Sequence, residues 1–144
     1  MALDSRQLAR LLAQIGRSLL EQKKWLEAQP HLRESLTIRE KAQPDLWSTF
    51  NTKSMFGGAL LGQKKYADAE PLLLAGYEGM KQREKTIPPQ AEIRVTEALE
   101  RLVQLYEATE KKDDAAKWRR QLDAIKAARK KVGRTTFANI ERRA

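Results

Sequence analysis

The residue types that supply most nucleophiles and metal ligands in enzymes are scarce in this sequence of 144 residues. It has no cysteine and a single histidine, His31. A disulfide framework, a CxxC redox pair and a thiol nucleophile are therefore excluded, and a zinc site would have to use carboxylates and one imidazole. His31 follows Glu27 by four residues, and no serine in a strained elbow accompanies it, so we expect a surface or partly packed histidine.

The segment from Gly57 to Lys65, GGALLGQKK, contains two glycines with the spacing of a phosphate-binding loop. A P-loop requires Lys and then Ser or Thr after the second glycine, whereas Gln63 follows Gly62 here. The apolar residues of this segment also keep a helical spacing instead of following a strand. We therefore predict that Gly57 serves the close packing of two helices.

Acidic residues are numerous, but none forms an isolated pair in apolar sequence, which a raised carboxyl pKa would require. Glu97 with Arg101, and Glu107 with Lys111, stand four residues apart, which is the spacing of ion pairs on a helix surface. The sequence therefore predicts no catalytic residues, no metal site and no cofactor, and we do not expect an enzyme.

The formal net charge of +9 comes mainly from the end of the chain. Residues 111–144 hold twelve Lys and Arg against four Asp and Glu, whereas the first 110 residues are nearly balanced. A negatively charged partner, such as nucleic acid or an anionic membrane surface, would therefore bind the last helix and the tail. The strongest basic cluster consists of Lys126, Arg129, Lys130, Lys131 and Arg134.

Two interpretations of this basic segment stay open. It is either such an anion-binding helix, or a solubilising end cap in which Gly133 closes the last helix and a frayed tail follows. The end cap is favoured because the basic residues are interleaved with one aromatic residue only, Phe137. Val132, Phe137 and Ile140 also form a candidate apolar stripe for docking on the domain or on a second copy.

The composition, rich in Ala, Leu, Glu, Lys, Gln and Arg, and the helical spacing of apolar residues predict an all-α protein. We predict six helices, over residues 4–21, 25–42, 45–62, 66–86, 90–109 and 112–132. Asp45 is expected to cap the third helix, and Ile87-Pro88-Pro89 gives the strongest stop signal. Trp25 and Trp118 are expected in the core, and Trp47 is expected to pack on the preceding helix.

Two stretches of the chain repeat each other without a gap. Residues 21–32, EQKKWLEAQPHL, align with residues 62–73, GQKKYADAEPLL, at a period of 41. Small residues recur in both copies with steps of twelve and seven, at Gly16, Ala28 and Ser35 and again at Gly57, Ala69 and Gly76. A degenerate third copy, offset by 46, repeats the steps at Val103, Ala115 and Leu122. Small side chains at such positions let two antiparallel helices approach closely.

This pattern resembles the tetratricopeptide repeat (TPR), which has a small residue in its first helix and an aromatic residue followed by alanine at the start of its second. The period is similar to that of kinesin-light-chain-type repeats, and residues 39–122 are similar to the TPR region C-terminal to planctomycete serine/threonine protein kinases. The resemblance implies a TPR domain over residues 1–132, in which three antiparallel helix pairs stack as a right-handed superhelix. The implied repeats span about 9–42, 50–86 and 96–129, and residues 133–144 would form a basic tail or capping segment.

In TPR proteins the ligand lies in a concave groove lined mainly by the first helix of each pair. Carried over by position, the groove would be lined by Arg10, Ala13, Arg17, Leu20, Asn51, Ser54, Gly58, Leu61, Glu97, Glu100, Gln104 and Glu107. Because the first unit is basic and the third acidic, a bound peptide would place acidic residues near Arg10 and Arg17 and basic residues near Glu97 and Glu100. The Lys, Asn and Arg with which some TPR proteins hold a terminal carboxylate are missing at the matching positions, so chaperone tails are disfavoured.

The resemblance implies a non-catalytic scaffold that binds a peptide or protein segment, as a module of a bacterial signalling protein. We expect a cytoplasmic monomer or weak homo-oligomer, because no run approaches the ~20 apolar residues of a membrane span and the first residues lack the pattern of a secretory signal. One alternative is a basic helical-repeat protein that binds nucleic acid or an anionic surface through residues 111–143. Another is a designed or reconstructed repeat protein without a natural partner.

Overall fold

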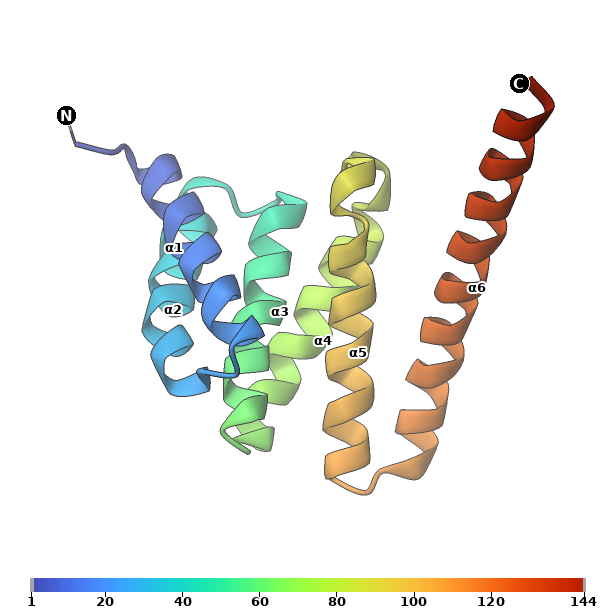
Figure 1. The fold of residues 1–144 in the computed structure, drawn as a ribbon. Helices are drawn as coiled ribbons and strands as arrows, with labels where there is room; N and C mark the ends of the chain where they lie inside the picture. The colour runs from blue at the N-terminus through green and yellow to red at the C-terminus, as the bar shows by residue number, and fades with distance from the viewer. Residues whose placement is uncertain (1, 144) are drawn as a thin grey trace.

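The computed structural model describes residues 2–143, apart from the side chains at 136 and 137, and most of these residues lie in helices (Figure 1). The helices are α1 (Ser5–Glu21), α2 (Trp25–Ala42), α3 (Trp47–Gly62), α4 (Tyr66–Gln82), α5 (Ile93–Ala108) and α6 (Lys112–Arg143). Two short 3-10 turns, η1 (Glu84–Thr86) and η2 (Pro89–Ala91), connect α4 to α5. No strand occurs among these residues, and the predicted all-α class is confirmed for them.

Each helix packs against its neighbours in the sequence, and α3 also contacts α1 and α5. Helices α1 and α2, α3 and α4, and α5 and α6 form three antiparallel pairs that follow one another across the molecule (Figure 1). The first helices of the pairs, α1, α3 and α5, therefore share one surface of the molecule.

The turn inside each pair has the same backbone geometry. Lys23, Lys64 and Glu110, which follow α1, α3 and α5, have φ angles of 60°, 63° and 59°. In the first turn the N–H of Lys24 donates to the carbonyl of Leu19 at 2.8 Å, and the other two turns have the equivalent bond. This is the Schellman ending of a helix, which is usually built with glycine at the left-handed position. The three pairs therefore share a common helix-turn-helix unit.

The last helix is longer than predicted. It was expected to end at residue 132, but α6 continues through Gly133 to Arg143. Gly133 does not adopt a positive φ, and a Cβ atom at this position would meet nothing within 4 Å. A glycine ends a helix when it turns into the left-handed region, whereas a glycine that stays helical costs only about 1 kcal/mol relative to alanine. The Lys, Arg and Ala residues around it are good helix formers and offset this cost.

The predicted capping of α3 by Asp45 is wrong, because no side chain caps this helix and its N-cap residue is Leu46. Asp45 is instead held by Arg83, whose Nε donates to the Asp45 carbonyl at 2.6 Å and whose Nη2 lies 3.4 Å from Oδ1. The Arg83 guanidinium also lies over the ring of Phe50, with Cζ 4.2 Å from the centroid. Helix α4 ends at Gln82 and not at residue 86, because residues 84–86 form η1 ahead of the two prolines.

The small residues of the repeat lie where helices approach closely, as predicted. A Cβ atom at Gly57 would lie 2.8 Å from Leu73 Cδ2, and one at Gly76 would lie 2.7 Å from the backbone nitrogen of Ser54. In the first unit the Leu32 side chain lies where a Cβ atom at Gly16 would be, and the other three members of the two units, Ala28, Ser35 and Ala69, are fully buried. Close helix packing at Gly57, the interpretation preferred over a phosphate loop, is therefore confirmed.

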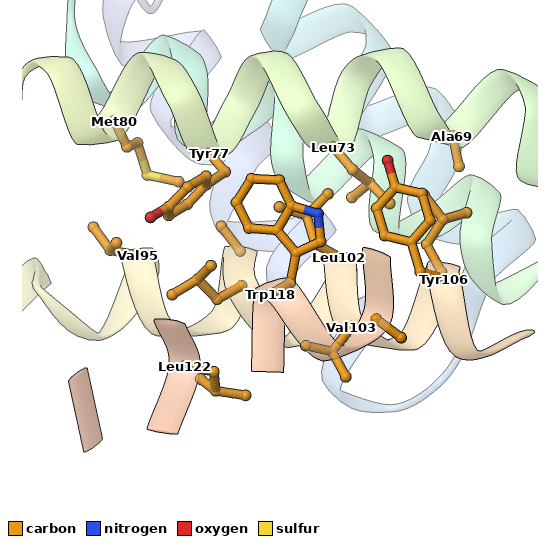
Figure 2. Packing of buried hydrophobic residues seen from close by; sticks show 14 of the residues in the cluster. Ala69, Leu73, Tyr77, Met80, Val95, Leu102, Val103, Tyr106, Trp118 and Leu122 are labelled. Atoms are coloured by element: carbon orange, nitrogen blue, oxygen red, sulfur yellow. The ribbon is translucent and has the colours of Figure 1, made fainter. Parts of the chain in front are cut away.

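An aromatic contact joins α6 to α4 (Figure 2). Trp118 is 6% exposed and meets Tyr77 edge to face, with ring centroids 5.3 Å apart. Figure 2 shows Trp118 and Leu122 of α6 facing the side chains of α4 and α5. The predicted core position of Trp118 is confirmed, whereas Trp25 is only half-buried. Trp47 packs on the core cluster that joins α3 to α6, which contains no residue of the preceding helix on which it was expected to pack.

Two glycine substitutions distinguish packing from conformational freedom. We expect Gly76→Ala to destabilise the protein by about 1–3 kcal/mol, since the new methyl group meets backbone atoms of α3 that cannot move alone. Gly133→Ala should be neutral or stabilise the protein by up to about 1 kcal/mol, because the site is open and helical. Urea denaturation followed by circular dichroism measures both, and equal effects of the two substitutions would contradict the packing assigned to Gly76.

The buried phenol of Tyr106 gives the stability a dependence on alkaline pH. Burial raises the pKa of Tyr106 to about 12, and the nearby Glu70 carboxylate acts in the same direction. The folded state therefore favours the neutral phenol, so this stabilisation is present below the unfolded pKa of about 10 and is lost as the pH rises toward 12. We expect the urea midpoint to fall less between pH 9 and 11 in Tyr106→Phe than in the parent protein.

Candidate functional site

A cleft of about 290 Å³ lies on the surface that α1, α3 and α5 share. It is formed mainly by the C-terminal halves of these helices, with Trp25 of α2 at one side. Its lining residues are Leu20, Glu21, Trp25, Gly58, Leu61, Gly62, Glu97, Glu100, Arg101 and Gln104. The Trp25 ring occupies the place where a Cβ atom at Gly62 would lie, so this glycine lets the indole reach the cleft.

Half of the predicted groove residues line this cleft: Leu20, Gly58, Leu61, Glu97, Glu100 and Gln104. Asn51 and Ser54 are buried on α3, Arg17 is half-buried on α1, and Arg10 is exposed on the same helix. Two predicted residues lie elsewhere. Ala13 is part of the hydrophobic core, and the exposed Glu107 pairs with Arg119 of α6.

Arg101 is the residue of this site that sequence reasoning misplaced. It was expected on the helix surface in an ion pair with Glu97, but its side chain is only 14% exposed. The guanidinium crosses from α5 to α3, where Nη1 donates to Ser54 Oγ at 2.9 Å, and the side chain lies over Gly58. The pair with Glu97 is present at 3.7 Å. The small residues Ser54 and Gly58 were the available signal, because they leave room on α3 for a long side chain.

Charges of the first and third helix pairs meet at this surface. Burial lowers the pKa of Arg17, and Arg94 lowers it further, whereas Glu97 and Glu21 raise it. Glu97 accepts from Arg94 and also pairs with Arg101, so one carboxylate serves two guanidinium groups. Helix α5 therefore brings Arg94, Glu97 and Arg101 close to Arg17, so charges of both signs meet on this surface.

A second concentration of positive charge lies on α1 and α2. Burial lowers the pKa of Arg39 on α2, and Arg10 and Arg17 lower it further. The guanidinium of Arg39 donates to the Ser48 carbonyl at 3.1 Å and to Thr52 Oγ1 at 2.8 Å, near the N-terminal end of α3. Since arginine stays protonated at neutral pH, these groups form a basic region on this part of the molecule.

Three buried polar atoms of α1, α3 and α5 have no hydrogen-bond partner among the described residues. They are Arg17 Nε, a donor, Asn51 Oδ1, an acceptor, and Thr96 Oγ1 of a hydroxyl group. Leaving such an atom unpaired costs about 1–3 kcal/mol, and native structures contain few of them. None of the three residues lines the cleft.

The other residues singled out in the sequence have simpler environments. His31 is half-buried on α2. In place of the expected pair of Glu107 with Lys111, Lys111 pairs with Glu70 at 3.6 Å.

Within residues 2–143, no group of three or more His, Cys, Asp or Glu side chains could hold a metal ion. None of the helices described here has the length and apolar character of a membrane span.

The basic cluster of the last helix is spread around α6. Lys126, Lys130, Lys131 and Arg134 are exposed, and Arg129 is half-buried. Lys126 pairs with Glu100 of α5 at 3.7 Å, which links the cluster to the edge of the cleft. Val132 and Ile140 of the candidate apolar stripe are 65% and 61% exposed, so they do not dock on the domain, and the Phe137 side chain lies outside the described part.

No protein-family model matches this chain, and no curated protein matches it either.

Removal of the shared carboxylate tests the cluster around Arg101. We expect Glu97→Gln to destabilise the protein by about 1–2 kcal/mol, because Arg94 and Arg101 lose their charged acceptor in a partly buried site. The matched control is Glu107→Gln on the same helix, where the exposed pair with Arg119 should be worth less than about 1 kcal/mol. Urea denaturation compares the two variants. If Glu107→Gln lowers the free energy of unfolding as much as Glu97→Gln does, the position of Glu97 in the cluster does not explain its contribution to stability.

Proposed function

We propose that this protein is a non-catalytic, TPR-like scaffold that binds an extended peptide or protein segment across α1, α3 and α5. The observation that carries the proposal is the cleft on these three helices, which has apolar, amide and charged side chains on its lining. The resemblance of the repeat to the TPR pattern, and the three equivalent turns, support the same interpretation.

The lining of the cleft has the chemistry of a site for a polypeptide. The amide of Gln104 can accept from and donate to a peptide group, and binding would bury the apolar part of the cleft. The apolar contacts would come from Leu20, Trp25 and Leu61.

The charges give the bound segment a direction. The region of Arg10, Arg17 and Arg39 favours an acidic residue or a carboxyl group. The cleft lining carries three carboxylates, Glu21, Glu97 and Glu100, against one guanidinium group, Arg101, and this excess of negative charge favours a basic residue. The polarity thus runs from the arginines of α1 and α2 toward the carboxylates of the cleft.

The biological setting follows from the resemblance alone. TPR regions next to bacterial serine/threonine kinases suggest that this domain is a cytoplasmic module of a signalling protein. In that setting it would bring a substrate or a regulatory segment close to an enzyme without taking part in the reaction.

A selection of extended peptides on the whole chain tests this function. We expect binders that contain an acidic residue and a basic residue, and we expect Arg17→Glu and Glu100→Arg each to weaken them at least about tenfold, which is 1.4 kcal/mol. Arg120→Glu, at an exposed position on α6, is the control for charge reversal. Binding that tolerates both groove reversals would show that the groove is not the site. Loss of binding in the control alone would favour the alternative site on α6.

A further inference from the structure

Helix α6 extends far beyond the helix that it pairs with. It has 32 residues, whereas α5 has 16, which corresponds to lengths of about 48 and 24 Å. The buried residues of α6, Ala115, Trp118 and Leu122, all lie in its first half. From residue 126 onward no described side chain of this helix is buried. The second half of α6 is therefore a helix without a packing partner in the described part of the chain.

The face of α6 that packs on the core continues along this second half. At about 100° per residue, Trp118, Leu122 and Ile125 point to the same side of the helix, and Val132 and Ile140 fall within the same sector of about 80°. Val132 is 65% exposed and Ile140 is 61% exposed. The apolar stripe thus runs from the core into solvent, where nothing in residues 2–143 covers it.

A cleft of about 500 Å³ opens beside this stripe, where α6 leaves α5. Its apolar lining comes from Ile87, Ile93 and Val95 on one side and from Ile125 and Val132 on α6. Ile93 is 43% exposed. The cleft and the stripe together form an apolar strip of about 22 Å from Ile125 to Ile140, the length of roughly four helical turns.

Charge decides which occupant this strip fits. Residues 126–143 contain seven Lys and Arg against one glutamate, Glu141. Arg129 lines the cleft, lies in the same sector as the stripe, and forms no salt bridge within the described residues. Two carboxylates line the same cleft: Glu84 pairs with Lys81 at 2.8 Å, and Glu92 forms no salt bridge with Arg129. A second copy of α6 would bring two strongly basic segments together, which disfavours self-association.

We propose that this strip binds an acidic amphipathic helix of a partner protein, separate from the segment bound across α1, α3 and α5. The partner helix lies along α6 between residues 125 and 140. Its apolar side chains cover Ile125, Val132 and Ile140, a carboxylate pairs with Arg129, and further acidic residues face Lys126 and Lys130, which lie along one side of the stripe. Nucleic acid would satisfy the basic residues but would leave the apolar stripe uncovered.

A designed peptide tests the site directly on the whole chain. The probe is a fluorescein-labelled peptide of about 18 residues with Leu at heptad a and d positions and Glu at the flanking positions. We expect it to bind, to become helical on binding, and to protect amides of residues 126–140 from hydrogen exchange. A scrambled peptide of the same composition should bind at least about tenfold more weakly.

Variants then separate the apolar and the ionic contributions. We expect Val132→Asp and Arg129→Glu each to weaken the probe about tenfold or more, whereas Arg120→Glu changes its affinity by less than about twofold. Val132 and Arg120 are exposed and Arg129 is half-buried, and none of them belongs to the core, so circular dichroism should show an unchanged fold. A probe in which Lys replaces Glu should prefer Arg129→Glu over the parent chain, as a charge-swap rescue.

Several results would overturn the proposal. Equal binding of the scrambled peptide, or equal losses in Arg120→Glu and Arg129→Glu, would show a diffuse charge effect and not a helix site. A short RNA duplex that displaces the probe and ignores Val132→Asp would assign the segment to nucleic acid. A dimer in light scattering that Val132→Asp dissolves would assign it to self-association. None of these results bears on peptide binding across α1, α3 and α5, which Arg17→Glu tests separately.

Discussion

At Gly57 and Gly76 a side chain or the backbone of the neighbouring helix lies where a Cβ atom would otherwise be. This close approach fixes the distance between α3 and α4, and Gly16 does the same for α1 and α2. Helices in contact through small residues lie nearer each other than leucine-packed helices, and their side chains interlock over a longer part of their length. The position of α3 between α1 and α5, and so the shared surface of these helices, depends on this spacing.

The shared surface owes its chemistry to the small residues of α3. Ser54 and Gly58 leave room for the Arg101 side chain, which crosses from α5 and is held by Ser54 and Glu97. A larger residue at either position would turn Arg101 toward solvent and leave α3 and α5 with an apolar contact only. Small side chains thus have two effects in this protein. They allow close packing inside a helix pair, and they make room for a charged group between two pairs.

The sequence was most informative where one local pattern had one structural meaning. Glycines repeated at a fixed period predicted the close contacts correctly, because their spacing matches the geometry of a helix pair. Gly133 was misleading, since a glycine fits both a helix end and a helix interior, and only the backbone conformation decides. Asp45 was misplaced because its partner, Arg83, is 38 residues away. Arg101 was predicted to pair with its neighbour Glu97 on the helix surface, whereas its burial depends on residues of another helix. The unpaired atoms of Arg17 and Asn51 correspond to no sequence pattern.

The hydrophobic core is divided into two clusters of unequal size. The larger cluster joins the second half of the molecule, from α3 to α6, and the smaller one joins α1, α2 and part of α3. Cooperative units with less buried apolar surface open more readily, so α1 and α2 should exchange their amide hydrogens first and together. The surface of α1, α3 and α5 spans both clusters. A ligand that contacts α1 and α5 at once would therefore couple the opening of the smaller unit to the stability of the larger one. The affinity of such a ligand would depend on the free energy of this local unfolding as well as on the contacts that the ligand makes.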